Sequence, residues 1–536
     1  MTSLQQHSAL ISQTMSHPNK DPNGHNSNGK RTRGALAFPI NNFRRYITLI
    51  SQQVAIGASL IVKHPFTPPP VPTWPLHLAL FVAVIRATAD HQEHIVEDIS
   101  DIRHWIDTFF HYLPKLPMMH IVPYKLPIPA YGRGFPGVLE PLEQGETGHR
   151  TLPGIWIADS KVWSKVMKMP IAQSAKGSKD PYAAREGEQV IFYTHGGGYF
   201  ICSTATHREM LWRISRATGR RIFATTAVDY RLAPEHPFPA ALQDASHAFH
   251  HLTDPQGVGF DPKNVTVAGD SAGGGLTIAL MMYQRDHGLS MASKAFLLSP
   301  WLDLTMSCES WETNSMDYLP SPPRHEHRFN PISFYCSGKD KMKTMARHPY
   351  ISPLWGSLEG LPPLLIQCGE AERLRDECIL FNYKAGGCFG NSNKLPFQTK
   401  TTTMRKSRSG AEDTTSQVEL DMYPGMVHVF QAIPFLPESS MALQRMLEFM
   451  QRKEAEVAGL EETVGMEVPF GVGEEADDES EELAMRGLEE VVAAGKLMEE
   501  FVVKSRRMED LPAFLQLRED DARLEERSPA TATIRA

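Results

Sequence analysis

The string Gly269-Asp270-Ser271-Ala272-Gly273 has the residue types and spacing of a nucleophile elbow, G-x-S-x-G. An apolar, strand-like run precedes it and a helical run follows, so we expect a sharp strand-to-helix turn at the serine. The small residues around Ser271 allow such a tight turn, which lifts the hydroxyl out of the sheet. A phosphate-binding loop is the alternative interpretation, but no lysine follows the glycines as that loop requires.

A second string, His195-Gly196-Gly197-Gly198, follows another strand-like run. Because glycine has no Cβ, successive backbone N–H groups can point into one cavity. We expect the amides of Gly196, Gly197 and Ala272 to bind the oxyanion of a tetrahedral intermediate, with His195 and Gly198 completing the motif. A flexible turn is the alternative for this string alone. Two such strings in one chain favour the catalytic interpretation.

A third string, residues 229–241 (DYRLAPEHPFPAA), leaves a strand, turns at its prolines and enters a helix. With these three strings the sequence resembles the hormone-sensitive-lipase family of α/β-hydrolases, which includes arylacetamide-deacetylase-like and steryl-acetyl-hydrolase-like esterases. The resemblance covers roughly residues 150–450. It implies that the charged residues of the third string brace the oxyanion loop and take no part in the chemistry.

The family places an acidic residue and then a histidine after the nucleophile. His428 follows the last strand-like run, next to Pro424 and Gly425, and the resemblance implies that it is the base that a serine nucleophile needs. The family motif Asp-x-Leu-x-Asp-Glu aligns with Glu372 at its first position, where this chain has Glu in place of the commoner Asp. Asp376 is the second candidate for the acid, and Glu370 is the third.

Short β-rich runs alternate with helical runs from about residue 150, which predicts the scaffold of these residues. We expect an α/β class fold, the α/β-hydrolase fold, with a mostly parallel twisted sheet, helices on both faces and a helical cap. The catalytic domain is predicted at 150–455, with a surface insertion at 386–416. The predicted strands are Gln189–Thr194, Arg221–Val228, Asn264–Ala268, Ala295–Leu298, Leu364–Gln367 and Val418–Met422.

The two ends of the chain differ from this pattern. Residues 1–36 are polar and are predicted to be disordered, without the apolar core of a secretory signal. Residues 37–130 are predicted to form an N-terminal helical or cap region. Within it, the uncharged 17-residue run Tyr46–Val62 leaves three interpretations open: a packed helix, an interfacial helix on a membrane, or a single span. Residues 461–536 form an acidic extension, with 21 acidic and 9 basic residues.

The overall composition narrows the class of protein. An apolar content of 41% and a charged content of 22% are typical of a soluble globular chain, and a net charge of -8 argues against a nucleic-acid partner. The six cysteines are too scattered for a zinc motif or a disulfide framework, which favours a reducing compartment. A cytoplasmic location is predicted, with association with the endoplasmic reticulum membrane as the alternative.

The resemblance therefore implies a serine esterase that hydrolyses a short- to medium-chain acyl or acetyl ester through Ser271, His428 and Glu372 by way of an acyl-enzyme. A small-molecule ester is the expected partner, and no metal or cofactor is expected. Acyl transfer or deacetylation in a biosynthetic pathway uses the same residues and stays open. A non-catalytic ligand-binding relative is less favoured, because such relatives have lost the histidine that His428 retains. The sequence does not indicate the oligomeric state.

Overall fold

The computed structural model describes residues 40–452, except 64–65, 68, 96–98, 101, 104–105, 107–109, 111–115, 226–229, 323–326 and 386–417. The chain divides into two compact units, 1–51 and 52–536. In the first unit the described residues, 40–51, form the beginning of helix α2 (Ile40–Lys63). The segment predicted to be disordered (1–36), the predicted insertion (386–416) and the acidic extension (461–536) lie outside the described residues.

The described residues of the second unit contain an eight-stranded sheet with the strand order β1-β2-β4-β3-β5-β6-β7-β8. Strands β3 to β8 run parallel, whereas β2 pairs antiparallel with both β1 and β4. The predicted, mostly parallel α/β-hydrolase sheet is confirmed. The strands are β1 (Met119–Pro127), β2 (Thr151–Asp159), β3 (Val190–Thr194), β4 (Arg221–Thr225), β5 (Val265–Asp270), β6 (Lys294–Leu298), β7 (Leu364–Gly369) and β8 (Val418–Tyr423).

The first two strands were not among the predicted ones. β1 lies within residues 37–130, which the sequence assigned to the helical or cap region, so the sheet begins upstream of residue 150. The physical reason is its place at the edge of the sheet, where a strand tolerates Pro123 and needs no continuous apolar run. In β2 the pair Pro153-Gly154 interrupts the strand pattern in the same way.

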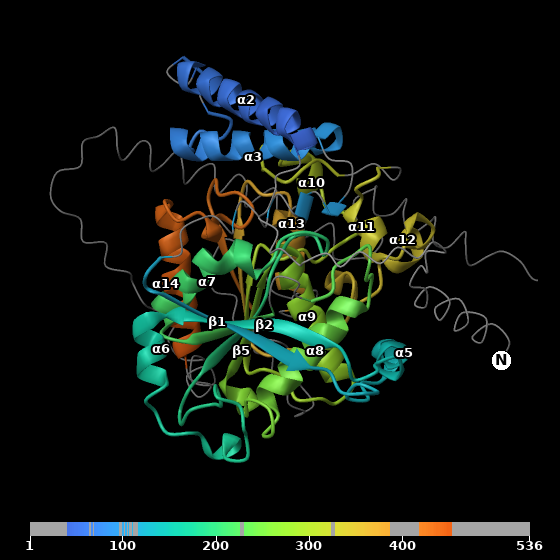
Figure 1. The fold of residues 1–536 in the computed structure, drawn as a ribbon. Coiled ribbons are helices and arrows are strands. Elements are labelled where there is room, and N and C mark those ends of the chain that lie inside the picture. Colours follow the sequence, from blue (N-terminus) through green and yellow to red (C-terminus); the bar gives the residue numbers. More distant parts are fainter. Residues whose placement is uncertain are drawn as a thin grey trace, which may run out of the picture. The chain divides into compact units, whose positions relative to one another are not determined.

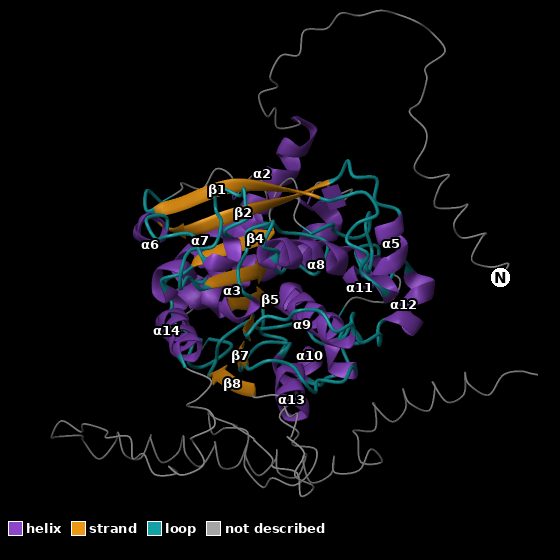
Figure 2. Ribbon diagram, turned by 90° about the horizontal axis from the view of Figure 1, so that it is seen from below, coloured by secondary structure: helices purple, strands orange, loops and turns teal. Residues whose placement is uncertain are grey.

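Helices cover both faces of the sheet (Figures 1 and 2). Helices α7 (Thr204–Thr218) and α14 (Pro437–Gln451) pack on one face, against a cluster that includes Ile191 and Tyr193. Helices α8 (Ala240–Thr253), α9 (Ser271–Asp286) and α13 (Arg375–Ala385) pack on the other, against a cluster that includes Val190 and Phe192. Consecutive residues of β3 thus enter opposite cores, as expected of a parallel strand that is buried on both sides.

The remaining described helices connect the strands or lie near the carboxyl edge of the sheet. They are α3 (Leu76–Ile95), α5 (Glu140–Gln144), α6 (Ser160–Val166), α10 (Ser310–Thr313), α11 (Pro331–Tyr335) and α12 (Lys339–Met345), with short 3-10 helices at Gly137–Leu139, Gln173–Ala175, Pro262–Asn264, Pro353–Trp355 and Phe430–Ala432.

Helix α3 and the residues just before it pack on the loop that follows β8. Trp74, Leu78 and Val82 form one buried cluster with Met426 and Phe430, and the Trp74 indole N–H donates a hydrogen bond to the Gly425 carbonyl. A helical segment distant in the sequence therefore holds the loop that carries His428.

Helix α2 contains the uncharged run Tyr46–Val62. From residue 52 onward α2 contacts α3, where Gln53 Nε2 donates a 2.6 Å hydrogen bond to Thr88 Oγ1. Among the described helices, none has the length and apolar character that crossing a membrane requires.

Candidate active site

The loops after β3, β5, β7 and β8 carry all of the predicted site residues. Since these strands are parallel, the loops meet at one edge of the sheet, where α/β proteins bind their ligands. The strand ends are level, because Thr194 lies opposite Gly269 and Gly369 lies opposite Tyr423. The fold therefore brings the His-Gly-Gly-Gly string, Ser271, Glu372 and His428 to one edge of the sheet.

Ser271 is the first residue of α9 and directly follows β5. Its φ of +50° lies in the left-handed region, which non-glycine residues seldom adopt. The motif needs small residues because the backbone after β3 packs directly against this turn. A Cβ on Gly273 would lie 2.1 Å from the Thr194 carbonyl oxygen. This strained strand-to-helix turn is the geometry of a nucleophile elbow.

The side chain of Asp270 connects the turn at Ser271 to the glycine loop, which consists of residues 195–198. Its Oδ1 accepts hydrogen bonds from the Gly196 N–H (3.0 Å) and from the Tyr193 hydroxyl (2.7 Å), and its Oδ2 lies 3.1 Å from His207 Nε2. Burial by itself would raise the pKa of Asp270, but the charge of His207 and these hydrogen bonds lower it below its ordinary value. A buried carboxylate therefore holds the loop.

At Gly196 the structure differs from the prediction. Its N–H donates to Asp270, so this amide is not available to an oxyanion. The amides of Gly197 and Gly198, at φ of +113° and +61°, donate no hydrogen bond within the part of the chain that is described. The Ala272 N–H lies in the first turn of α9, where backbone donors have no partner within the helix. These three amides are the candidate oxyanion donors.

In the third string of the sequence, residues 229–241, an uncharged residue makes the main contact with the glycine loop. The Tyr230 hydroxyl donates a 2.9 Å hydrogen bond to the His195 carbonyl, and the two rings stack with centroids 4.6 Å apart. The predicted contribution of charged residues is indirect. Glu235 pairs with Arg103 at 2.9 Å, and Arg103 donates to the Phe200 carbonyl just beyond the glycines.

The candidate acid and base lie next to each other. His428 Nδ1 and Glu372 Oε2 are 3.9 Å apart, and both side chains are buried. This separation exceeds a hydrogen bond, and within the described residues no hydrogen bond joins His428 to the Ser271 hydroxyl. Catalytic hydrogen bonds are often long in a free enzyme and tighten when substrate binds, so the placement suits a triad.

Burial controls the charge of this pair. It lowers the pKa of His428 from 6.5 to about 4, although the charge of Asp270 acts in the opposite direction. It also raises the pKa of Glu372 well above its ordinary value, although a hydrogen bond from Ser299 favours the carboxylate. The imidazole is therefore neutral near pH 7, which is the form that a general base requires.

The two alternative acids are occupied elsewhere. Asp376 accepts a 2.8 Å hydrogen bond from the Ser310 N–H, and Glu370 accepts a 2.9 Å hydrogen bond from the Gly425 N–H. Of the three acidic candidates, only Glu372 forms an ion-pair contact with His428 in the described structure. The geometry therefore favours Glu372.

Comparison with known proteins identifies the fold and the family of this chain. A family model described as the alpha/beta hydrolase fold matches residues 191–387. A solved esterase of the bacterial hormone-sensitive lipase family is 28% identical, covers 70% of this chain and 98% of its own, and has a TM-score of 0.48. An esterase of Acinetobacter venetianus is 30% identical over 52% of this chain and 80% of its own length. An acetyl-hydrolase of Streptomyces hygroscopicus is 33% identical over 49% of this chain and 75% of its own length.

The chain belongs to the hormone-sensitive-lipase family of α/β-hydrolases. In this α/β-hydrolase, sequence reasoning missed a fully buried aspartate, Asp317, in the connection between β6 and β7. Its carboxylate accepts hydrogen bonds from the N–H groups of Arg373 (3.0 Å), His428 (3.1 Å) and Tyr318 (2.8 Å). Asp317 thus ties the loop of the candidate acid to the loop of the candidate base.

A second residue that the sequence did not indicate is Ser299, which follows β6. Its hydroxyl donates a 2.6 Å hydrogen bond to Glu372 Oε2 and accepts a 3.0 Å hydrogen bond from the Val429 N–H. Neither Asp317 nor Ser299 can be recognised from its neighbours in the sequence, because the partners Arg373, His428, Glu372 and Val429 lie on other loops. The strand order of the sheet places them beside Glu372 and His428.

Proposed function

We propose that this chain is a carboxylic ester hydrolase that uses Ser271 as its nucleophile and acts on short- to medium-chain acyl or acetyl esters. The observation that carries the proposal is the left-handed backbone of Ser271, at the carboxyl edge of a parallel sheet whose other loops bear the glycine loop and the Glu372–His428 pair. The relatives named acetyl-hydrolase and esterase support the reaction class.

In the proposed mechanism, His428 takes the proton of the Ser271 hydroxyl as its oxygen attacks the ester carbonyl. The amides of Gly197, Gly198 and Ala272 donate hydrogen bonds to the oxyanion that forms. His428 then gives its proton to the leaving alcohol, and an acyl-enzyme remains. A water molecule activated by His428 hydrolyses this acyl-enzyme, while Glu372 stabilises the imidazolium that forms in each half of the reaction.

The test is hydrolysis of p-nitrophenyl esters, from acetate to laurate, by the full-length chain. We expect activity in the wild type and its loss, by at least about 10³-fold, in Ser271→Ala. The matched control is Ser160→Ala, which changes a half-buried serine whose hydroxyl donates a hydrogen bond to the Met118 carbonyl, and it should retain full turnover. Activity in Ser271→Ala equal to that of the wild type would refute the mechanism. Adding an alcohol acceptor separates hydrolysis from acyl transfer, since transfer would yield the new ester.

We also propose that the described end of α2 lies on a lipid surface. The support is an exposed apolar face: Val54, Ile61 and Val62 are 66%, 54% and 68% exposed, and their spacing places them with Ala58 on one side of the helix. Flotation with phosphatidylserine-containing vesicles tests this. The wild type should float and Ile61→Glu should not; equal flotation of both would refute the proposal, with Ile171→Glu as an exposed control.

A further inference from the structure

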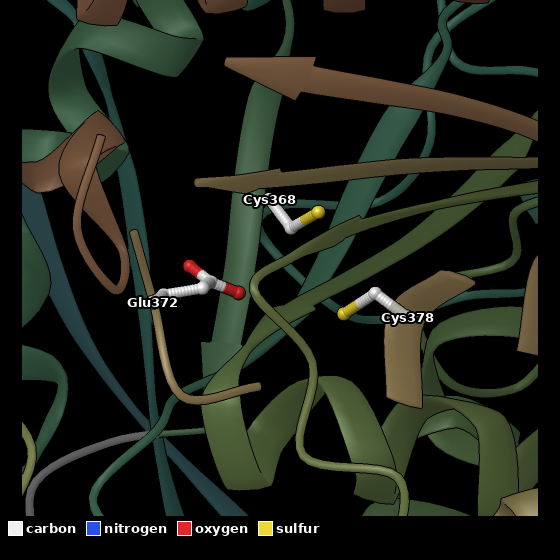
Figure 3. Close-up of side chains that lie close together, drawn as sticks. All are labelled: Cys368, Glu372 and Cys378. Carbon is white, nitrogen blue, oxygen red and sulfur yellow. The ribbon is translucent and has the colours of Figure 1, made fainter. Parts of the chain in front are cut away.

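Two thiols lie behind the candidate triad acid. Cys368 belongs to β7, Glu372 to the loop that follows, and Cys378 to α13, and all three side chains are fully buried. The two sulfur atoms and a carboxylate oxygen lie within 4.8 Å of one another. Figure 3 shows one carboxylate oxygen of Glu372 directed toward the space between the two sulfurs. We call these three residues the Cys-Glu-Cys cluster.

The carboxylate of Glu372 has one oxygen that the triad does not occupy. Oε2 accepts hydrogen bonds from Ser299 Oγ (2.6 Å) and the Gly369 N–H (3.1 Å), and it lies toward His428. Oε1 is buried and has no hydrogen-bond partner among the described residues. A buried acceptor without a partner is uncommon in folded proteins and calls for an explanation, such as a bound cation.

The donor set selects a class of cation. Two thiolates and one carboxylate suit Zn²⁺ or Cd²⁺, whereas Mg²⁺ and Ca²⁺ prefer oxygen ligands alone. A tetrahedral zinc ion, with bonds of about 2.3 Å to sulfur and about 2.0 Å to oxygen, separates its ligand atoms by roughly 3.5–3.8 Å. The observed limit of 4.8 Å therefore requires only a small inward movement of side chains.

Binding at this place releases protons. Cysteine binds a metal ion as the thiolate, and the two sulfurs of the cluster belong to free, buried cysteines. A divalent cation that enters the cluster displaces one proton from each thiol and binds the two thiolates and the carboxylate. Because the cation must displace the thiol protons, the site favours a cation with a high affinity for thiolate sulfur.

We propose that the Cys-Glu-Cys cluster is an inhibitory site for a thiophilic divalent cation, Zn²⁺ or Cd²⁺. The inference rests on the proposed function, in which Glu372 holds and stabilises the His428 imidazole. Once Glu372 coordinates the cation, its carboxylate no longer stabilises imidazolium at His428. Turnover falls while substrate binding, which uses other residues, is retained.

The first experiment measures kcat and KM for p-nitrophenyl butyrate with and without Zn²⁺, using the full-length wild type, Cys368→Ala, Cys378→Ala and the control Cys308→Ala. Cys308 is a buried free thiol outside the cluster. The readout is the ratio of kcat without and with Zn²⁺ for each protein. We expect a ratio above about 10 for the wild type and Cys308→Ala, reversed by EDTA, and a ratio near 1 for the two cluster variants. Equal inhibition of all four proteins would overturn the proposal.

A second measurement detects the bound cation directly and requires no esterase activity. Its main protein, Ser271→Ala, keeps both cysteines of the cluster. Cd²⁺ is titrated into Ser271→Ala, and the ultraviolet charge-transfer absorption of Cd–thiolate bonds is followed. We expect saturation at one cation per chain with an intensity that requires two thiolates, and loss of this band in Ser271→Ala/Cys368→Ala. Absence of the band in Ser271→Ala overturns the metal site. The band together with a wild type inert toward every ester would keep the site and refute the proposed function.

Discussion

The carboxylate of Asp270 accepts a 3.0 Å hydrogen bond from the backbone N–H of Gly196, so the residue before the nucleophile holds the first glycine of the oxyanion loop. The two residues are 74 positions apart in the sequence and meet because β3 and β5 are neighbours in the sheet. With Gly196 fixed in this way, the proposed mechanism assigns the oxyanion to the amides of the next two glycines and of Ala272. The elbow and the loop therefore act as one structural unit.

We expect Asp270→Asn to lower kcat by about 10²-fold with little change in KM. The amide removes the charge that holds the Gly196 N–H and His207, and the loss matches that of one misplaced oxyanion donor. Steady-state kinetics with p-nitrophenyl butyrate measure the effect. Asp261→Asn is the control, because this aspartate caps a 3-10 helix and pairs with the exposed Lys263. A wild-type kcat in Asp270→Asn would contradict the positioning role.

Gly196→Ala tests the close approach of the loop to the elbow. An added Cβ would lie 2.2 Å from Asp270 Oδ2 and 3.0 Å from the Ser271 Cβ, so the loop must shift away from the nucleophile. We expect kcat to fall by at least about 10²-fold. Gly57→Ala is the matched control, since a Cβ there meets no atom within 4 Å and alanine favours the helix. Equal kcat values for the two variants would show that the contact is unimportant.

Glu372→Gln should lower kcat by roughly 10⁴-fold without unfolding the chain, because an amide cannot stabilise the imidazolium of His428. Asp376→Asn should keep near full turnover, since Asp376 bonds the Ser310 N–H and the neighbouring Arg375 instead. Circular dichroism during thermal unfolding shows whether each variant is folded. The reverse order of activities would transfer the role of the acid to Asp376.

The buried Asp317 predicts a dependence of stability on pH. Burial raises its pKa from 3.8 to about 6, against the hydrogen bonds from the N–H groups of Arg373 and His428 and the charge of Arg373. A carboxyl group with a higher pKa in the folded chain binds its proton more tightly there. Its stabilising contribution is therefore full below about pH 3.8 and is lost as the pH rises through about 6.

Between pH 4 and 7 we expect the free energy of unfolding of the wild type to fall, relative to that of Asp317→Asn, by up to about 3 kcal/mol. Urea unfolding of both proteins across this range measures the difference. Asparagine does not titrate, so it isolates the contribution of Asp317 from those of nearby Glu372 and His428. Parallel stability curves would show that the carboxyl group does not titrate in this range.

Short sequence motifs predicted those parts of the candidate site that are formed by consecutive residues. The elbow at Ser271 depends on a strand, small residues and a helix that are consecutive in the chain, so its strained turn could be expected from the sequence. The parallel strands from β3 onward could likewise be predicted, because short β-rich runs alternate with helical runs in this part of the chain. The edge strand β1 carries Pro123 and is only partly buried, so the same signal was missing there.

The sequence by itself determined which residue types exist for the chemistry and in which order they follow one another. The tertiary structure decided which of them meet. It directs the Gly196 N–H to Asp270, places Glu372 rather than Asp376 beside His428, and brings Cys368 and Cys378 close to Glu372. The reason is physical: contacts between loops depend on strand order and register, and these are set by packing of the whole sheet rather than by neighbours in the chain.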